Sequence, residues 1–297
     1  MLFSIVIPAY NYAHLLPRAL ESALAQRGDD YEVVVIDDGS TDSTPAVVAE
    51  LQRKHPQRFI YLRQENRGLA AVRNRGVRET CGEYLLFLDA DDRLLPDALE
   101  RFRQFLAGST RWGMVCAGHR SVHPDGRTRN HAAFGLSTDP RQNFHRYIRK
   151  EFGISNGATI MARRVFERIR YPEQVRSSED IPVFAQVLAL FDCAALAEPV
   201  LEVHKHDDSL RHNLPLILKA GTGIVDILFD PAVLPAEFMG YRREFEARQH
   251  LSLFRSLYLA RRYPQARQEY LDGLRLCPSL LFDLSHLRKF LRTLGRS

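Results

Sequence analysis

Short apolar runs alternate with stretches of helical periodicity through the first third of the chain, and this alternation constrains the fold most. The runs cover residues 3–7, 31–36, 59–62 and 83–88, which are expected to form strands. Strands that alternate with helices indicate an α/β fold around a largely parallel sheet. Between the first two runs, apolar side chains recur at helical spacing, at Leu15, Leu16, Ala19, Leu20, Ala23 and Leu24.

Polar and turn-forming residues follow three of these runs. Ligands of parallel sheets bind outside the carboxyl ends of the strands, where the loops gather. We therefore expect three segments that are distant in the sequence to converge around one ligand. These segments are Pro8-Ala9-Tyr10-Asn11 after the first run, residues 37–42 (DDGSTD) after the second and residues 89–92 (DADD) after the fourth.

The DADD segment concentrates three carboxyl groups in four residues, Asp89, Asp91 and Asp92. Carboxylate oxygens are hard ligands, and several of them at one strand end can hold a divalent cation. Acidic residues also cluster where strands simply turn, so a turn without a metal is the alternative interpretation.

Residues 66–76 (NRGLAAVRNRG) are expected to begin a helix, with Asn66 as its cap. A helix amino terminus with arginine side chains favours an anion such as a phosphate. Arg73 and Asn74 lie next to a face of small residues and are expected to point inward, whereas Arg75 is expected to be solvated.

Together with Ser178-Glu179-Asp180, these segments resemble those of family-2 glycosyltransferases of the GT-A fold, an inverting group that uses nucleotide-diphospho-sugars. The matching segments span roughly the first two thirds of the chain. The resemblance implies a Rossmann-like, mixed and mostly parallel sheet flanked by helices in residues 1–210. Its nucleotide-sugar half would be residues 1–110 and its acceptor half residues 111–210, followed by a helical C-terminal region in residues 211–297.

The resemblance also implies roles for individual residues. Asp38 would accept a hydrogen bond from the base, Asp89 would hold the ribose or sugar, and Asp91 would ligate the Mn2+ or Mg2+ that bridges the diphosphate. Further along, Asn156 and Gly157, in a strand expected at residues 156–161, would face the acceptor or the sugar, as would Glu179. The residues implied in nucleotide-sugar binding are Pro8, Ala9, Tyr10, Asn11, Asp38, Asn66, Gly68, Arg73, Asp89, Ala90 and Asp91.

The chemistry of such a transfer explains why acids are needed. Departure of a nucleoside diphosphate leaves growing negative charge on two phosphates, which a bound cation stabilises. The acceptor hydroxyl must lose its proton as it attacks, and Asp180 is the expected base, near the start of a helix capped by Ser177 or Ser178. Direct displacement would invert the anomeric centre. The alternative is that Glu179 and Asp180 only offset the helix dipole.

Residues 201–209 (LEVHKHDDS) alternate apolar and polar side chains, as an edge strand would, with His204 and His206 on one face. The segment resembles the family's late His-x-x-Ser element, in which His206 and Ser209 take the matching places. His206 is therefore expected to be a metal ligand together with Asp91. Two solvent-facing histidines are the alternative.

The net charge of +5 and the pI near 9.1 call for an anionic neighbour. No zinc-ligand spacing or aromatic RNA-binding signature is present, so nucleic acid is not an expected partner. Beyond about residue 210 only helical periodicity remains. The last such segment sets Arg288, Lys289 and Arg292 against a Leu/Phe stripe, as helices at a membrane surface do. A helix that packs on the core with a wet basic face is the alternative.

The cysteines and the hydrophobic segments bear on location. The four cysteines match no metal or redox spacing, and neither a secretory signal nor a membrane-spanning segment is apparent, so a cytoplasmic protein is expected. A peripheral position on the inner membrane face is the alternative. Processive polysaccharide synthases of the family add membrane helices and a Gln-x-x-Arg-Trp element, which the surroundings of the only tryptophan, Trp112, do not match.

These features predict a glycosyltransferase that moves a sugar, most simply from a UDP-sugar, to a hydroxyl of a saccharide or lipid-linked acceptor. The reaction is expected to be metal-dependent, inverting and non-processive, in the assembly of cell-surface polysaccharide or glycolipid. A sugar-nucleotide pyrophosphorylase is one alternative, but it would carry a glycine-rich loop in place of Pro8-Ala9-Tyr10-Asn11. A non-catalytic glycan-binding protein is the other, and it would not need the full set of acids.

Overall fold

The computed structural model describes residues 1–205 and 214–295 of the chain. Strands and helices alternate through the first part, as the apolar runs predicted, and each of the four expected strands is present within two residues of its expected ends. The elements are β1 (Phe3–Ala9), α1 (Leu16–Leu24), β2 (Tyr31–Asp37), α2 (Thr44–Lys54), β3 (Ile60–Arg63), α3 (Leu69–Glu79), β4 (Tyr84–Phe87), β5 (Arg93–Leu94) and α4 (Ala98–Ala107).

The second part begins with a β-hairpin and ends with a long strand. Residues 123–126 form the hairpin turn, with Gly126 at a φ of +81° that favours glycine. The strand expected at residues 156–161 begins instead with a 3-10 turn, where Gly157 packs against the side chain of Leu201 too closely for a Cβ. The elements are β6 (Met114–Val122), β7 (Thr128–His131), α5 (Pro140–Ile148), η1 (Asn156–Ala158), β8 (Thr159–Ala162), η2 (Arg163–Glu167), α6 (Asp180–Leu190) and β9 (Cys193–His204).

The strands form one mixed sheet in the order β3-β2-β1-β4-β8-β6-β9-β5, with β7 paired to β6. The first four are parallel to one another, and β6 is parallel to β9, whereas β8, β7 and β5 are antiparallel to their neighbours. The register pairs Ala9 with Asp37 and Val6 with Phe87. The polar segments that follow β1, β2 and β4 therefore leave the sheet at the same side, where the carboxyl ends of these parallel strands lie.

Both faces of the parallel part are covered, because every residue of β1 and of β4 is buried. Helices α1 and α3 both pack on β1, and they belong to crossovers that run in opposite directions along the sheet. Right-handed crossovers of this kind place their helices on opposite faces.

The expected edge strand at residues 201–209 is wrong for its described part. At Leu201 and Glu202, β9 is paired with a strand on each side, β6 on one and β5 on the other.

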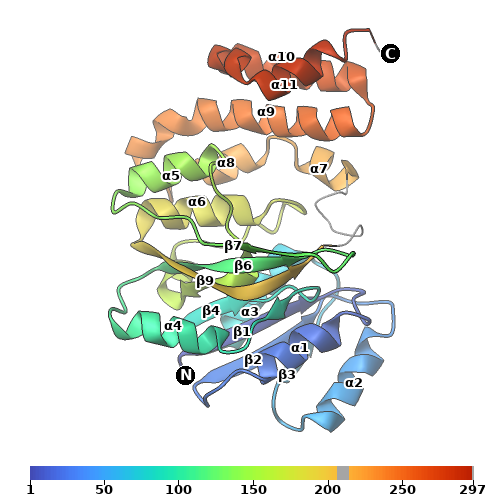
Figure 1. The fold of residues 1–297 in the computed structure, drawn as a ribbon, viewed down its shortest axis with the longest axis vertical. Coiled ribbons are helices and arrows are strands. Elements are labelled where there is room, and N and C mark those ends of the chain that lie inside the picture. Colours follow the sequence, from blue (N-terminus) through green and yellow to red (C-terminus); the bar gives the residue numbers. More distant parts are fainter. Residues whose placement is uncertain (206–213, 296–297) are drawn as a thin grey trace.

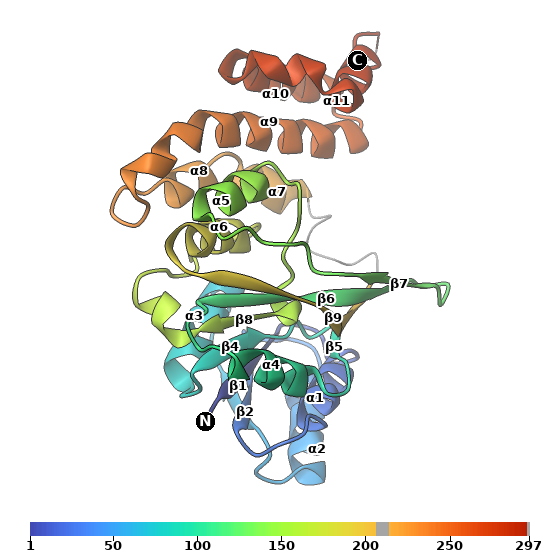
Figure 2. The ribbon, with the colours of Figure 1, turned by 60° about the vertical axis from the view of Figure 1, so that its left-hand side comes forward.

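Helices follow the sheet domain, as expected: α7 (Leu214–Ala220), α8 (Ile224–Leu228), η4 (Ala236–Tyr241), α9 (Arg242–Leu259), α10 (Tyr263–Leu276), η5 (Pro278–Phe282) and α11 (Leu284–Leu291). Figures 1 and 2 show α9 as a layer over α5 and α8, with α10 and α11 beyond it at the far end of the molecule from α2. The main hydrophobic core extends as far as Phe245, and a second core starts at Ala247. The two cores therefore meet within α9, whereas the boundary near residue 210 stays a prediction.

Among the described residues, no helix combines the length and the apolar character that crossing a membrane requires. The four cysteines carry free thiols in the structure.

Candidate active site

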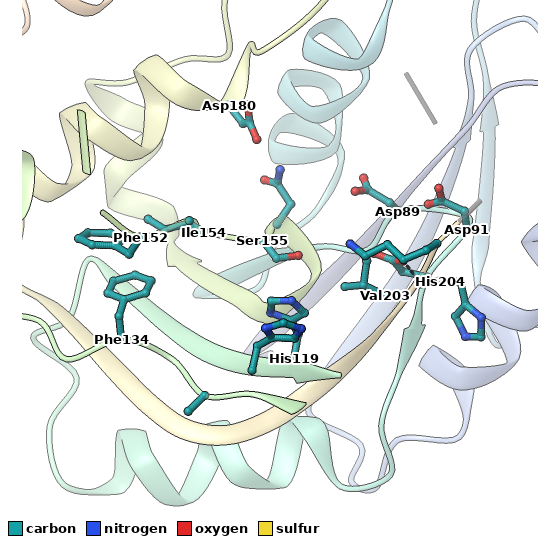
Figure 3. A pocket seen from close by; sticks show the side chains of 16 residues that line it. Asp89, Asp91, His119, Phe134, Phe152, Ile154, Ser155, Asp180, Val203 and His204 are labelled. Carbon is teal, nitrogen blue, oxygen red and sulfur yellow. Dashed lines mark hydrogen bonds between the residues drawn. The ribbon is translucent and has the colours of Figure 1, made fainter. Parts of the chain in front are cut away.

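A cavity of about 740 Å³ opens at the edge of the sheet where β4 ends, and Figure 3 shows the side chains that line it. At one end lie Asp89 and Asp91, with Asp92 also in the lining; we call this the acid end. At the other end Figure 3 places Phe134 and Phe152, and Asp180 points into the space between the two ends. Segments from both halves of the sheet domain thus contribute to one site.

The acid end brings the DADD carboxyl groups together after β4. Asp89, Asp91 and Asp92 each offer one carboxylate oxygen, and these oxygens lie within 4.8 Å of one another. The backbone N–H of Asp92 donates to the carbonyl of Asp89 at 3.0 Å, and Asp92 Oδ1 accepts from the backbone N–H of His204 at 3.1 Å. The guanidinium of Arg18 on α1 donates to the backbone carbonyl of Asp91, and this hydrogen bond ties the acid loop to α1.

The charges at the acid end fit a divalent cation. Burial, together with the neighbouring Asp91, raises the pKa of Asp89 to about 6, although Arg73 opposes the shift. Burial and the other two carboxyl groups raise the pKa of Asp92 well above its ordinary value. A cation would offset both the burial of these carboxylates and their mutual repulsion, and hard carboxylate oxygens are the donors that Mn2+ and Mg2+ accept. The residues present therefore fit such an ion.

Arg73 on α3 links the acid end to the loop before α6. Its side chain is only 2% exposed, and it donates to Glu179 Oε1 at 2.8 Å and to Asp89 Oδ1 at 3.2 Å. The guanidinium also lies 5.2 Å from the ring centroid of Tyr171. Burial alone would lower the pKa of Arg73, but Asp89 and Glu179 keep it above its ordinary value. Arg73 and Asn74 thus point inward as expected, and a contact of Arg73 with the nucleotide stays a prediction.

Asp180 is the first residue of α6 and is half-buried. Burial raises the pKa of Asp180 to about 6, and the carboxyl group of Glu179 adds to the shift. A serine cap was expected for this helix, but neither serine caps it: Glu179 takes the cap position and uses its side chain for Arg73. Ser178 instead has a φ of +61°, so the chain turns sharply just before the helix. The carboxyl group is thereby directed at the cavity (Figure 3).

The loops after β1 and β2 are joined through Asn11. Its side-chain Oδ1 accepts from the backbone N–H groups of Thr41 at 2.8 Å and Asp42 at 3.3 Å, and the backbone N–H of Asn11 donates to Ser40 Oγ at 3.0 Å. Ala9 is buried at the end of β1, whereas Tyr10 is 43% exposed. The two segments therefore converge as the parallel register predicted.

Asp38 holds the next loop. Its Oδ1 accepts from Gln64 Nε2 at 2.7 Å and from the N–H of Arg67 at 2.9 Å, and its Oδ2 accepts from the N–H of Gly68 at 2.7 Å. Beside it, Gly39 and residues 63–66 line a second cavity of about 590 Å³. Asp38 thus shapes the wall of this cavity, and its hydrogen bond to a base stays a prediction.

The expected helix cap at Asn66 is wrong. Helix α3 begins after Gly68, whose φ of +88° favours glycine; a Cβ there would also force the Arg176 side chain to shift. Asn66 Oδ1 instead accepts from Arg176 Nη1 at 3.3 Å. Arg75, which was expected to be solvated, is only 22% exposed and pairs with Glu79.

Other expected site residues lie in or beside the cavity. Asn156 lines it and accepts from Tyr171 through its Oδ1, and Gly157 is buried behind it. Ala90 is buried within the acid loop. Glu179 was expected near the acceptor or sugar; its side chain accepts a hydrogen bond from Arg73, and a contact with the acceptor or sugar stays a prediction. His206 lies outside the described residues.

Sequence reasoning missed four aromatic residues of the cavity, which we call the aromatic end: Phe134 and Phe152 lie remote from Asp89 and Asp91, and His119, which stacks on His131, lies between them and the acids (Figure 3). His119 and His131 are register partners across the β6–β7 hairpin. Counting outward from the turn at residues 123–126 would have placed them opposite each other. Phe134 and Phe152 lie in stretches without periodicity and gave no comparable signal.

Comparison with known proteins gives a family match and several likenesses. The profile described as Glycosyl transferase family 2 matches residues 4–170. The succinoglycan biosynthesis protein ExoO of Rhizobium meliloti is 35% identical over 195 residues, which are 62% of this chain and 55% of ExoO. The uncharacterized glycosyltransferase alr2836 of Nostoc sp. is 43% identical over 115 residues, which are 39% of this chain and 36% of alr2836. The chain therefore spans about half or less of the length of these two relatives.

Two solved structures have a similar fold. Staphylococcus aureus TarS 1-349 in complex with UDP-GlcNAc superposes with a TM-score of 0.68 at 18% identity, over 99% of this chain and 89% of that one. The mannosyltransferase PcManGT of Pyrobaculum calidifontis, in complex with GDP-Man and Mn2+, gives 0.57 at 19% identity, over 98% and 83%. These likenesses confirm the expected fold of a mixed, mostly parallel sheet with a helical C-terminal region.

Proposed function

The chain belongs to glycosyl transferase family 2, and from this premise we propose that it transfers a sugar from a nucleoside-diphosphate sugar to a hydroxyl of a saccharide or lipid-linked acceptor. One observation carries the proposal: the acids that follow β4, Asp89, Asp91 and Asp92, line the same cavity as Asp180, which lies about 90 positions further along the chain. A UDP-sugar is the donor of choice, since a structure of the same fold holds UDP-GlcNAc.

The acid end would hold the divalent cation. Asp91 and its neighbours Asp89 and Asp92 supply the oxygen ligands, with His206 as a further candidate. The ion supplies positive charge against the diphosphate that leaves. The Mn2+ in the mannosyltransferase of similar fold supports this choice of cofactor. The second cavity beside Asp38 and Gly39 would take the nucleoside, at the edge where β1 and β2 end.

Asp180 would remove the proton of the acceptor hydroxyl. A base works best when its pKa lies near the working pH, and burial has moved the pKa of Asp180 in that direction, to about 6. The hydroxyl oxygen then attacks the anomeric carbon as the bond to the diphosphate breaks, so one displacement inverts the anomeric centre. Arg73 positions both Glu179 beside this base and Asp89 at the acid end.

The setting we propose is non-processive assembly of a cell-surface polysaccharide or glycolipid, in the cytoplasm or on the inner face of the membrane. The name of the relative ExoO supports polysaccharide assembly.

A peripheral membrane contact is supported by the C-terminal helices, where Phe282, Leu284 and Leu291 are 84%, 60% and 54% exposed. Arg288 and Lys289 lie on α11 between the last two. Leu287 and Phe290 of the same helix pack on the second core.

The test is a transfer assay with UDP-, GDP- and dTDP-sugars, with and without Mn2+, that records release of nucleoside diphosphate. We expect one donor to be consumed and the rate to depend on the metal. Release of the nucleoside diphosphate with retention of configuration would contradict inversion. Formation of pyrophosphate from a nucleoside triphosphate and a sugar phosphate would identify a pyrophosphorylase, and binding without any turnover would identify a glycan-binding protein.

A further inference from the structure

The aromatic end of the cavity is built from two stacked ring pairs. The rings of Phe134 and Phe152 have centroids 3.5 Å apart at an interplanar angle of 18°. Those of His119 and His131 have centroids 4.6 Å apart at 12°. All four residues line the same cavity as the acids and Asp180. In Figure 3 the phenylalanines lie at the end of the cavity that is remote from Asp89 and Asp91.

The phenylalanine pair forms a supported apolar plate. Phe152 is buried, and behind it lie the ring of Tyr147, at 5.6 Å between centroids, and the guanidinium of Arg146, at 5.4 Å from the ring centroid. Phe134 rests on Phe152 and stays half-buried. Because Phe152 fills the space beneath it, Phe134 cannot sink into the core. A flat apolar face is thus held ready at the wall of the cavity.

The histidine pair adds a polar group of fixed position. His131 Nε2 shares a hydrogen bond with Ser121 Oγ at 3.1 Å, and this bond anchors its ring. His119 stacks on that ring and has no side-chain hydrogen bond to any described residue. Burial, His131 and Lys205 lower the pKa of His119 to about 4, so its ring is neutral at pH 7. A neutral imidazole offers one N–H donor and one nitrogen acceptor, which is what a hydroxyl group needs.

The charge of the cavity favours an uncharged occupant. Four aspartates line it, Asp89, Asp91, Asp92 and Asp180, and Lys205 is the only Lys or Arg among the described lining residues. A bound divalent cation and a donor diphosphate would roughly cancel each other. A carboxylate or phosphate on the acceptor would therefore be repelled close to Asp180.

We infer that Phe134 and His119 form the acceptor subsite of this enzyme and that it binds a neutral pyranose, with a C–H face of the sugar on Phe134 and a hydroxyl on His119. The inference rests on the proposed function and deepens it by naming the acceptor class. Asp180 lines the same cavity and lies between the acids and the phenylalanines in Figure 3, so we place the reacting hydroxyl of the pyranose on the side that faces Asp180.

The experiment uses the full chain, its best donor with Mn2+, and a panel of methyl glycosides as acceptors. For Phe134→Ala we expect the KM for the accepted glycoside to rise by about tenfold, with the KM for the donor changed by less than about twofold. His119→Ala should do the same through loss of the hydroxyl contact. Phe134→Tyr keeps the apolar face and should restore the acceptor KM toward the wild-type value. Leu259→Ala, which removes an exposed apolar side chain at the end of α9, is the control and should leave both KM values unchanged.

Matched glycosides test the charge of the acceptor. A methyl glucoside and the corresponding glucuronide differ only at C6, and we expect the glucuronide to have a KM at least about tenfold higher. Equal use of the two would overturn the neutral class. An unchanged acceptor KM in both Phe134→Ala and His119→Ala, or use of a lipid acceptor without any sugar, would overturn the subsite.

Failure of the proposed function would look different. In that case the wild-type protein would neither bind nor hydrolyse any nucleoside-diphosphate sugar. If donor hydrolysis occurs but no glycoside of the panel is glycosylated, the acceptor inference fails and the proposed function stands. If Phe134→Ala proves unstable in thermal unfolding, the subsite is tested by the acceptor KM of His119→Ala, because His119 is only half-buried, and by the activity that Phe134→Tyr retains.

Discussion

At the acid end of the cavity backbone geometry positions the functional groups, whereas at the aromatic end side chains position one another. The acid end directly follows β4 in the parallel part of the sheet, and its loop is held by the hydrogen bonds from the Asp92 N–H to the Asp89 carbonyl and from the His204 N–H to Asp92 Oδ1. The aromatic end depends on ring stacking of His119 with His131 within the β6–β7 hairpin and of Phe134 with Phe152 between two irregular segments. On the roles proposed above, the fold would dictate the donor site, whereas the acceptor site would depend on side-chain packing.

The largest expected effect concerns the proposed base, Asp180, which lies between the two ends. Asp180→Asn should reduce transfer by about 10³-fold, because a general base contributes on the order of 10² to 10⁴. Donor binding should be unchanged, as measured by thermal shift. Asp192→Asn, a change to an exposed acid, is the matched control and should transfer normally.

The stability of this variant sharpens the prediction. The pKa of Asp180 is raised in the folded protein to about 6, so the carboxyl group stabilises the fold when protonated and this stability is lost as the pH rises through about 6. At pH 7 the neutral Asp180→Asn protein should be at least as stable as the wild type. A variant that transfers sugar at the wild-type rate would remove Asp180 from the mechanism.

Arg73 is expected to matter for stability more than for chemistry. Arg73→Met leaves Glu179 and Asp89 without their buried partner and should lower the free energy of unfolding by about 3 kcal/mol. Urea unfolding measures the change. Arg78→Met, an exposed arginine in the last turn of the same helix, should cost less than about 0.5 kcal/mol. Equal costs for both would mean that the Arg73 network does not hold the two segments together.

Asp91→Ala should separate the metal from the rest of the donor site. In the wild type, donor at about a hundredfold excess over its dissociation constant adds about 2.7 kcal/mol of stability. For the variant we expect the part of this gain that depends on Mn2+ to disappear. Calorimetric unfolding with UDP-sugar, with and without Mn2+, records both parts. A Mn2+ effect that survives in Asp91→Ala would place the ion elsewhere.

The smallest effect is the pH dependence. Asp180 acts as a base only when deprotonated, so with saturating donor kcat should fall about tenfold per pH unit once the pH drops below about 6. The residual rate of Asp180→Asn should lack this step. A wild-type kcat that is constant from pH 7 to pH 5 would show that the titration of Asp180 does not limit the reaction.

Most of the fold and the acid end could be predicted from the sequence, because apolar periodicity and the ends of parallel strands are local signals. The inward position of Arg73 followed from the small residues beside it, and its neighbour Asn74 was found the same way. Helix caps were harder: Asn66 and Ser178 are good cap residues by type, but tertiary contacts with Arg176 and a φ of +61° decided otherwise. The stacking of Phe134 on Phe152 depends on long-range packing that no local pattern encodes.

The central claim is that the DADD acids gather around one cation that holds the donor diphosphate. A crystal structure with UDP and Mn2+, with anomalous data collected at the manganese edge, tests it most directly. We predict one anomalous peak bonded to carboxylate oxygen of Asp91, next to Asp89 and Asp92, and to oxygens of the diphosphate. A diphosphate bound in this cavity with no manganese beside these acids, or manganese bound at another site, would contradict the claim.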